Sequence, residues 1–169
     1  LDQALARAAR SGKRVAVIGG GVGGCAAALA LAEAGRTVVM TEEFAWIGGQ
    51  LTSQAVPPDE HGWIERFGCT RTYRRFRDGV RAYYRAHYPL LPGLRDNPRL
   101  NPGNGWVSPL CHEPRVALAV LEALLAPHVS SGRVLILREH RPTAVALEGA
   151  ARVRAVTLRP PRDGTATAV

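Results

Sequence analysis

The stretch Val15-Ala16-Val17-Ile18-Gly19-Gly20-Gly21-Val22-Gly23-Gly24 decides the fold. Its four apolar residues indicate a strand, and its glycines indicate a turn. The Ala/Leu-rich run that follows, Cys25–Ala34, predicts a helix, and Thr37–Met40 predicts a second apolar strand. A strand, a glycine turn, a helix and another strand in this order predict a βαβ unit with a parallel pair of strands.

The spacing of the glycines indicates what the turn does. Gly19 permits a tight turn out of the strand, Gly21 lets the backbone approach a pyrophosphate, and Gly24 lets the helix pack closely on the strand. The free N–H groups of the helix N-terminus then face the phosphates, with the positive end of the helix dipole behind them. A plain βαβ unit with an empty glycine turn does not explain this spacing, so we expect a dinucleotide site.

An acidic residue completes the pattern. Glu42 directly follows the second predicted strand and lies 18 residues beyond Gly24. A carboxylate in that place can accept hydrogen bonds from ribose hydroxyls. The glycine loop by itself does not separate NAD from FAD, so both cofactors stay open at this point.

Length and composition limit the class of protein. The chain has 169 residues, 46% of them hydrophobic, which is enough for one domain with a sizeable core. No uninterrupted apolar run reaches about 18 residues, so we expect no membrane span, and no signal-peptide pattern is present. The chain starts at Leu1 rather than Met, which suggests a piece of a longer protein. The three cysteines form no CxxC pair, so we expect no metal site and a cytoplasmic, reducing setting.

The formal net charge is +8, and Lys13 is the only lysine among 22 basic residues. The arginines are scattered and are not interleaved with aromatic residues, so we expect no nucleic-acid partner. Their densest cluster lies on one predicted helix and is interpreted as a solvated helix face. Its members are Arg71, Arg74, Arg75, Arg77, Arg81 and Arg85.

The rest of the chain alternates between loops and periodic segments. Loops are expected at 44–61 and 97–112, and a turn at 148–151. Leu1–Arg10 is interpreted as a short amphipathic helix or a frayed lead-in. Helices are expected at Arg71–His87 and from Pro114 to a stop at Pro127, and strands at Val134–Leu137, Thr143–Leu147 and Val153–Leu158.

A second motif follows the acid-terminated strand, Trp46-Ile47-Gly48-Gly49-Gln50-Leu51-Thr52-Ser53. With the glycine loop, it makes the chain resemble the FAD-dependent oxidoreductases of the glutathione-reductase-like superfamily, in particular bacterial members with a GGQ segment. The corresponding pattern in many such flavoproteins is RxGGRxxS/T. Gly48, Gly49 and Ser53 fit it, whereas Trp46 and Gln50 replace the two arginines.

The resemblance implies an α/β fold, a Rossmann-like FAD/NAD(P)-binding domain with a central parallel sheet and a small antiparallel region. Residues 1–169 would be the N-terminal part of a single such domain in a longer chain, with a loop and helix insertion at 54–113. The resemblance also implies the cofactor contacts. Gly19, Gly21, Gly23 and Gly24 would contact the pyrophosphate, Glu42 with Glu43 the adenosine ribose, Gly49, Gln50 and Thr52 the flavin side, and Pro142 the adenine through its carbonyl.

The function implied is a flavin-dependent oxidoreductase that acts on a small-molecule substrate and passes electrons to an acceptor. Because the flavin performs the redox step, no catalytic residue is assigned here. Side chains that follow the GG segment or open the later helix are candidates, although packing and capping roles are commoner for them. They are His61, Glu65, Cys69, Cys111, His112 and Glu113.

Several points stay open in the sequence. The tryptophans Trp46, Trp63 and Trp106 are interpreted as packing anchors. An NAD-binding Rossmann enzyme and a truncated, non-catalytic nucleotide-binding module are the alternative functions. The sequence predicts no oligomeric state and no particular substrate.

Overall fold

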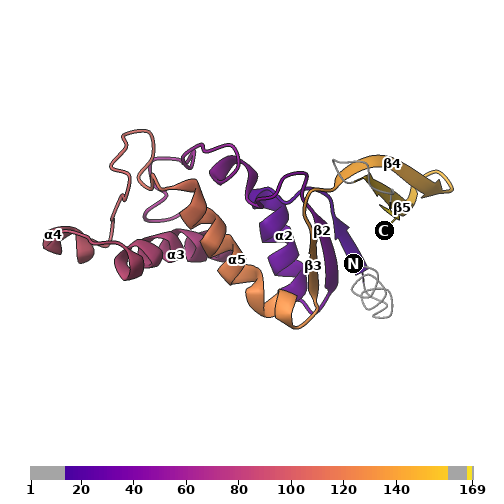
Figure 1. The fold of residues 1–169 in the computed structure, drawn as a ribbon, viewed down its shortest axis with the longest axis horizontal. Helices are drawn as coiled ribbons and strands as arrows, with labels where there is room; N and C mark the ends of the chain where they lie inside the picture. Colours follow the sequence, from indigo (N-terminus) through magenta and orange to yellow (C-terminus); the bar gives the residue numbers. More distant parts are fainter. Residues whose placement is uncertain (1–13, 160–166, 169) are drawn as a thin grey trace. The chain divides into compact units, whose positions relative to one another are not determined.

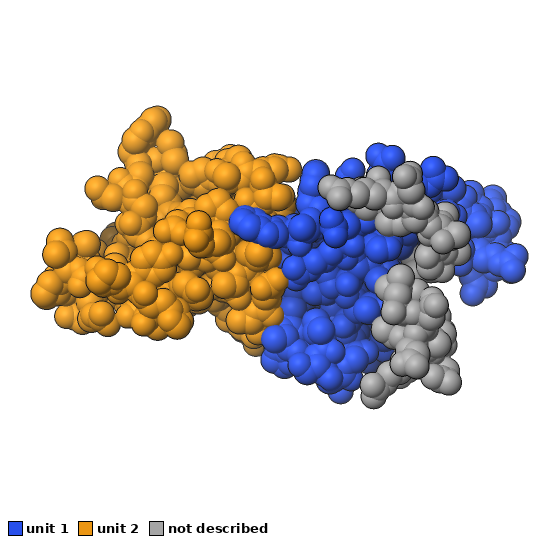
Figure 2. Space-filling view, viewed as in Figure 1, with its two compact units in different colours: residues 1–47, 125–169 blue, residues 48–124 orange. Residues whose placement is uncertain are grey.

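The computed structural model describes residues 14–159, 167 and 168. The chain divides into two compact units, which Figure 2 colours separately. Unit 1 comprises Leu1–Ile47 and Leu125–Val169, and unit 2 comprises Gly48–Leu124. The insertion predicted at 54–113 falls inside unit 2.

Unit 1 contains the predicted parallel sheet (Figure 1). Strands β1 (Arg14–Val17), β2 (Thr37–Thr41) and β3 (Val134–Leu137) pair in the order β1-β2-β3, with β2 in the middle. Val15 pairs with Val38, and Val38 pairs with Val134. The residues Val38–Met40 are buried, as expected for an apolar strand with neighbours on both edges.

Helix α2 (Val22–Glu33) connects β1 to β2 and packs on the sheet. Our sequence analysis started this helix at Cys25, which is wrong by three residues, because Gly23 and Gly24 already belong to its first turn. The Ala-rich inner face lets the helix lie close to the strands. Its buried residues are Cys25, Ala28, Leu29 and Ala32.

A second, antiparallel sheet follows in unit 1. Strands β4 (Arg141–Glu148), β5 (Arg152–Arg159) and β6 (Thr167–Ala168) pair in that order, so the expected antiparallel region is present. Val156 and Leu158 of β5 form a buried cluster with Val39 and Leu137 of the parallel sheet. Burial of these side chains joins the two sheets into one unit.

Unit 2 is built from α3 (Arg71–His87), the short α4 (Pro92–Arg95), the 3-10 turn η1 (Gly49–Leu51) and the first part of α5 (Pro114–Ser130). The α3 helix begins after Thr70, whose hydroxyl accepts a hydrogen bond from the Tyr73 N–H at 3.1 Å. A Cβ added to Gly79 would lie 2.7 Å from Val120, so α3 and α5 approach closely there. The core of the unit includes Leu51, Ile64, Phe76, Val80, Tyr84, Leu100, Leu110, Val116, Ala117, Val120 and Leu121.

The predicted end of α5 needs correction. Pro127 does not end α5, which continues to Ser130. A proline in the last turn removes one N–H donor, while its own carbonyl still accepts from the Ser131 N–H at 3.1 Å. The helix expected at residues 1–10 lies outside the described residues.

The prediction of a solvated arginine face on α3 is wrong for Arg77 and Arg81, which are buried. Arg77 donates to the carboxylates of Glu60 and Glu65, and Arg81 donates to Glu65 and, at 2.9 Å, to the Leu100 carbonyl. Two carboxylates compensate the two guanidinium groups, which makes their burial tolerable. The ion pairs attach the loop before α3 to that helix.

Candidate dinucleotide-binding site

The glycine turn between β1 and α2 has a tightly packed inner side. Gly19 has φ +100°, a conformation that favours glycine, and its N–H donates to Thr41 Oγ1 at 3.1 Å. A Cβ at Gly24 would overlap the Gly19 carbonyl oxygen, so only glycine lets the first turn of α2 sit this close. The packing role predicted for Gly24 agrees with this contact.

The outer side of the same turn is open. A Cβ added to Gly21 or to Gly23 would meet nothing within 4 Å. Gly21 is the N-cap of α2, and the first N–H groups of a helix have no acceptor within the helix. Free space, N–H donors and the positive end of the helix dipole therefore coincide at Gly21 and Gly23, which suits a phosphate group.

Glu42 is held beside this turn. The residue is 6% exposed, and its Oε1 accepts a hydrogen bond from the Phe44 N–H at 3.0 Å. Its backbone N–H donates to the Leu137 carbonyl and its carbonyl accepts from the His140 N–H, which fixes it at the end of β2. A Cβ at Gly20 would lie 2.9 Å from Glu42 Oε2. The carboxylate therefore lies directly against the glycine loop, whereas Glu43 is exposed.

Two further side chains support the loop, and our sequence analysis gave neither a role in it. The Cys25 Sγ donates to the Gly20 carbonyl at 3.2 Å, and the Thr41 hydroxyl is the acceptor for Gly19 described above. A polar residue at the end of an apolar strand is the signal that points to Thr41. The partner of that hydroxyl lies 22 positions earlier in the chain, where sequence spacing does not reveal it.

The GGQ segment lies in unit 2 and forms its own compact turn. Gly48 has φ +103°, and a Cβ there would lie 2.6 Å from side-chain atoms of Thr52 and Leu121. Thr52 is 1% exposed and its hydroxyl donates to the Gly49 carbonyl at 3.4 Å, so it closes the turn from inside. Gln50 is exposed. Of the three predicted flavin-side residues, Gln50 is therefore the one whose side chain faces outward.

Pro142, the predicted adenine contact, lies in β4 of unit 1, opposite Leu158 of β5. The residue is exposed, and the β4–β5 register shifts between Pro142 and Ala144. Because proline has no N–H, only its carbonyl is available to a ligand.

The candidates that follow the GG segment have structural partners. His61 Nδ1 accepts from the Trp63 N–H at 3.2 Å, and its Nε2 faces the Gly68 carbonyl at 3.3 Å. Burial raises the pKa of Glu65, but the hydrogen bonds and charges of Arg81 and Arg77 outweigh this, so the pKa is lowered from its usual value. Cys69 is half-buried.

The interpretation of the three tryptophans as packing anchors is wrong, since all three are exposed, Trp46 at 39%. Trp63 is 62% exposed and Trp106 is 95% exposed. Trp63 stacks on the exposed Phe67, with ring centroids 6.2 Å apart. Around Trp106, the loop is held instead by the small side chain of Asn101, which hydrogen-bonds to Gly105, Ser108 and Cys111.

His112 differs from the exposed His61 in the surroundings of its ring. Both ring nitrogens are buried and, within the described part of the chain, have no hydrogen-bond partner. The ring packs edge-on against Phe76 at 6.0 Å. Burial lowers the pKa of His112, so its neutral form is favoured. The neighbouring Glu113 N–H donates to the Tyr84 hydroxyl at 2.8 Å, which anchors the start of α5.

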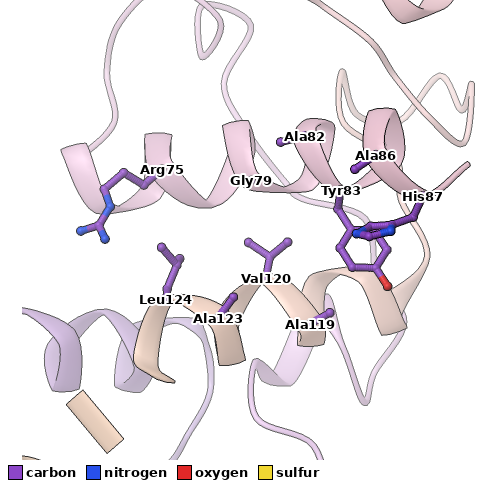
Figure 3. A pocket seen from close by; sticks show the side chains of 10 residues that line it. All are labelled: Arg75, Gly79, Ala82, Tyr83, Ala86, His87, Ala119, Val120, Ala123 and Leu124. Atoms are coloured by element: carbon purple, nitrogen blue, oxygen red, sulfur yellow. The ribbon is translucent and has the colours of Figure 1, made fainter. Parts of the chain in front are cut away.

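A groove of about 530 Å³ lies between α3 and α5 within unit 2 (Figure 3). Small side chains form much of its wall, and none of the predicted cofactor-binding residues lines it. The lining residues are Arg75, Gly79, Ala82, Tyr83, Ala86, His87, Ala119, Val120, Ala123 and Leu124.

Residues 14–159, 167 and 168 hold no group of His, Cys, Asp and Glu side chains that would suit a metal ion. They also include no helix with the length and apolar character needed to cross a membrane.

Comparisons with known proteins bear on the family and the fold of the chain. The family model described as FAD dependent oxidoreductase matches residues 14–168. A search for curated relatives found no match.

Among solved structures, the glycerol-3-phosphate dehydrogenase from Bacillus halodurans complexed with FAD has a TM-score of 0.58 at 13% identity, and the match covers 99% of this chain and 34% of that one. Thermovibrio ammonificans THI4 has a TM-score of 0.47 at 15% identity, and the match covers 94% of this chain and 52% of that one. The chain thus spans a third to a half of these proteins. The likeness to the dehydrogenase shows a shared Rossmann-type α/β fold, as the sequence predicts.

Proposed function

The chain belongs to the FAD dependent oxidoreductase family, whose cofactor is FAD, and we propose that its glycine loop and Glu42 bind the ADP half of that cofactor in a flavin-dependent oxidoreductase. The observation that carries the proposal is the open space at Gly21 and Gly23 beside a buried carboxylate. This combination suits a pyrophosphate followed by a ribose.

In this proposal, different residues of unit 1 contact different parts of the cofactor. Backbone N–H groups of the α2 N-terminus donate to the pyrophosphate oxygens, because the helix leaves them without internal acceptors. The Glu42 carboxylate accepts hydrogen bonds from the adenosine ribose hydroxyls, with Glu43 next to it in the chain. The Pro142 carbonyl accepts from the adenine.

For unit 2 the proposal concerns the GGQ turn. Gly49 and Gln50 offer a backbone with positive φ at Gly49 and an exposed amide side chain for the flavin-side phosphate or ribityl chain. Thr52 acts mainly by holding this turn in shape, since its hydroxyl donates to Gly49. Substitution of Gln50 by alanine therefore tests a contact, whereas substitution of Thr52 tests the shape of the turn.

FAD, when bound, supplies the redox chemistry, and the protein supplies binding, orientation and electrostatics. The family implies a small-molecule substrate and an electron acceptor. The cytoplasmic setting stays a prediction, and no residue of this chain is assigned to proton transfer.

The test is a visible absorbance spectrum of the purified chain after incubation with FAD and removal of free ligand. A retained flavin band is expected in the wild type, and Glu42→Ala is expected to weaken FAD binding about tenfold, because one or two charge-assisted hydrogen bonds are lost. Glu148→Ala is a matched control, since Glu148 is an exposed carboxylate of unit 1 whose ion pair with Arg152 lies on the β4–β5 hairpin.

A titration with NAD belongs to the same experiment. Saturable NAD binding without flavin retention would replace the proposal by an NAD-binding Rossmann enzyme, which Glu42 also suits. Binding of neither would contradict cofactor binding by this chain and favour a non-catalytic module.

A further inference from the structure

Thr41, the residue before the acid, holds the glycine turn from inside. Its Oγ1 accepts a hydrogen bond from the Gly19 N–H at 3.1 Å, and Thr41 is 1% exposed, whereas Gly19 is exposed. The Gly19 carbonyl faces the Cα of Gly24, where a Cβ would overlap it. Both polar backbone groups of Gly19 therefore meet atoms of the fold, the N–H at Thr41 and the carbonyl at Gly24.

We propose that Thr41 is a positioning residue for the cofactor and that the Gly19 N–H is not one of the phosphate donors. The motif itself already assigns turn and packing roles to Gly19 and Gly24, and the new element is the Thr41 side chain that holds Gly19. Gly19 and Gly24 shape the turn, while Gly21 and Gly23 border the space in which the phosphates bind. The inference rests on the proposed function and deepens it, because it says which part of the loop meets the ligand.

The physical reason lies in the single hydrogen bond that fixes the Gly19 peptide, because Gly19 itself is exposed and little else around it restrains the peptide. The Gly19 peptide has φ +100°, and the hydrogen bond to Thr41 fixes its orientation. Without that acceptor, the N–H loses its partner in the fold, and the exposed Gly19 peptide can rotate toward water instead. Rotation would displace Gly20 and Gly21, so the N–H groups that follow would no longer be oriented in advance for the pyrophosphate.

Three variants test this inference. Thr41→Val keeps the shape of the side chain and removes the acceptor, whereas Thr41→Ser keeps the acceptor. Thr157→Val makes the same change of atoms on β5 of unit 1, between the buried Val156 and Leu158 and hence on the other face of that strand. The measurements are the FAD dissociation constant and the hydrogen-exchange rate of the Gly19 amide by NMR in the ligand-free chain.

Thr41→Val is expected to weaken FAD binding about tenfold and to speed Gly19 amide exchange by at least about tenfold. Thr41→Ser and Thr157→Val should stay within about twofold of the wild type in both measurements. In the wild type, FAD should slow exchange at Gly21 and Gly23 and leave the rate at Gly19 unchanged.

Equal FAD binding by Thr41→Val and the wild type would overturn the positioning role. Slowing of Gly19 exchange by FAD, to the same degree as at Gly21, would overturn its exclusion from the phosphate donors. If Thr41→Val fails to fold, the wild-type exchange rates still test whether the Gly19 N–H is a phosphate donor. Thr41→Ala, which also lacks the acceptor, then tests the positioning role of Thr41. Failure of the wild type to bind FAD would contradict the proposed function instead, and the Gly19 exchange rates would still show whether Thr41 holds the turn.

Discussion

The Cα of Gly24 lies against the carbonyl oxygen of Gly19, so closely that a Cβ at position 24 would overlap that oxygen. The side chain of Val17 is also within reach, 3.5 Å from the same Cβ position. Both neighbours belong to the end of β1 and the turn that follows it. The first turn of α2 is therefore seated directly on the turn, with no room for a side chain.

Gly24→Ala should for this reason destabilise the fold itself. The added methyl meets backbone rather than a flexible side chain, so α2 or the turn has to shift, at a cost of about 1–3 kcal/mol. Urea unfolding of the ligand-free variant measures this cost. An unfolding free energy equal to that of the wild type would show that the helix is not packed on the turn as described.

Gly21→Val should separate binding from folding. The residue has φ −60°, which any L-residue adopts, and a Cβ there meets nothing within 4 Å. The side chain would instead fill the space proposed for the pyrophosphate. We expect an unfolding free energy within about 1 kcal/mol of the wild type and loss of FAD retention. Retention of FAD would mean that the phosphates bind elsewhere.

The comparison of Gly21 with Gly24 shows what the sequence predicts and what it leaves open. The βαβ unit and the glycine spacing follow from the apolar pattern and the turn residues, and a helical crossover between two strands implies that they pair in parallel. The role of Thr41 depends on a hydroxyl that meets an N–H 22 residues away, and no local pattern encodes that meeting.

The same limit explains the error on α3. A run of arginines at helical spacing usually marks a solvated face. Here Glu60 and Glu65, in the preceding loop, supply the carboxylates that allow Arg77 and Arg81 to be buried. Only the tertiary fold brings these charges together, so the residue pattern of α3 alone predicted the helix correctly and misplaced two of its side chains.

Arg77→Met should strongly destabilise unit 2. The substitution leaves Glu60 buried, with 2% of its side chain exposed, without its guanidinium partner, while Tyr73 still donates to it at 2.6 Å. Removal of one member of a buried pair typically costs about 3–5 kcal/mol. Arg71→Met on the exposed start of α3 is the matched control, expected within about 0.5 kcal/mol of the wild type. Equal effects of the two variants in urea unfolding would contradict the buried network.

Because the ring nitrogens of His112 are buried, we expect the free energy of unfolding to depend on pH below about 6.5. Burial lowers its pKa in the folded chain below the ordinary value of 6.5, so the unfolded chain binds the proton more readily. The neutral ring therefore makes its full contribution to the free energy of unfolding above pH 6.5. This contribution declines as the pH falls from 6.5 through the pKa of His112 in the folded chain. The pKa of Glu65 is lowered from 4.5, so Glu65 takes up its proton at lower pH and does not obscure the effect of His112.

His112→Phe tests the prediction because phenylalanine keeps a ring against Phe76 and cannot take up a proton. Unfolding free energies from urea titrations at pH 8, 7, 6 and 5 should fall for the wild type below pH 6.5 and fall less for the variant. The slope with pH is the informative quantity, since a change in packing shifts the stability equally at every pH. Parallel curves for the two proteins would show that the ring of His112 reaches water and titrates as it does in the unfolded chain.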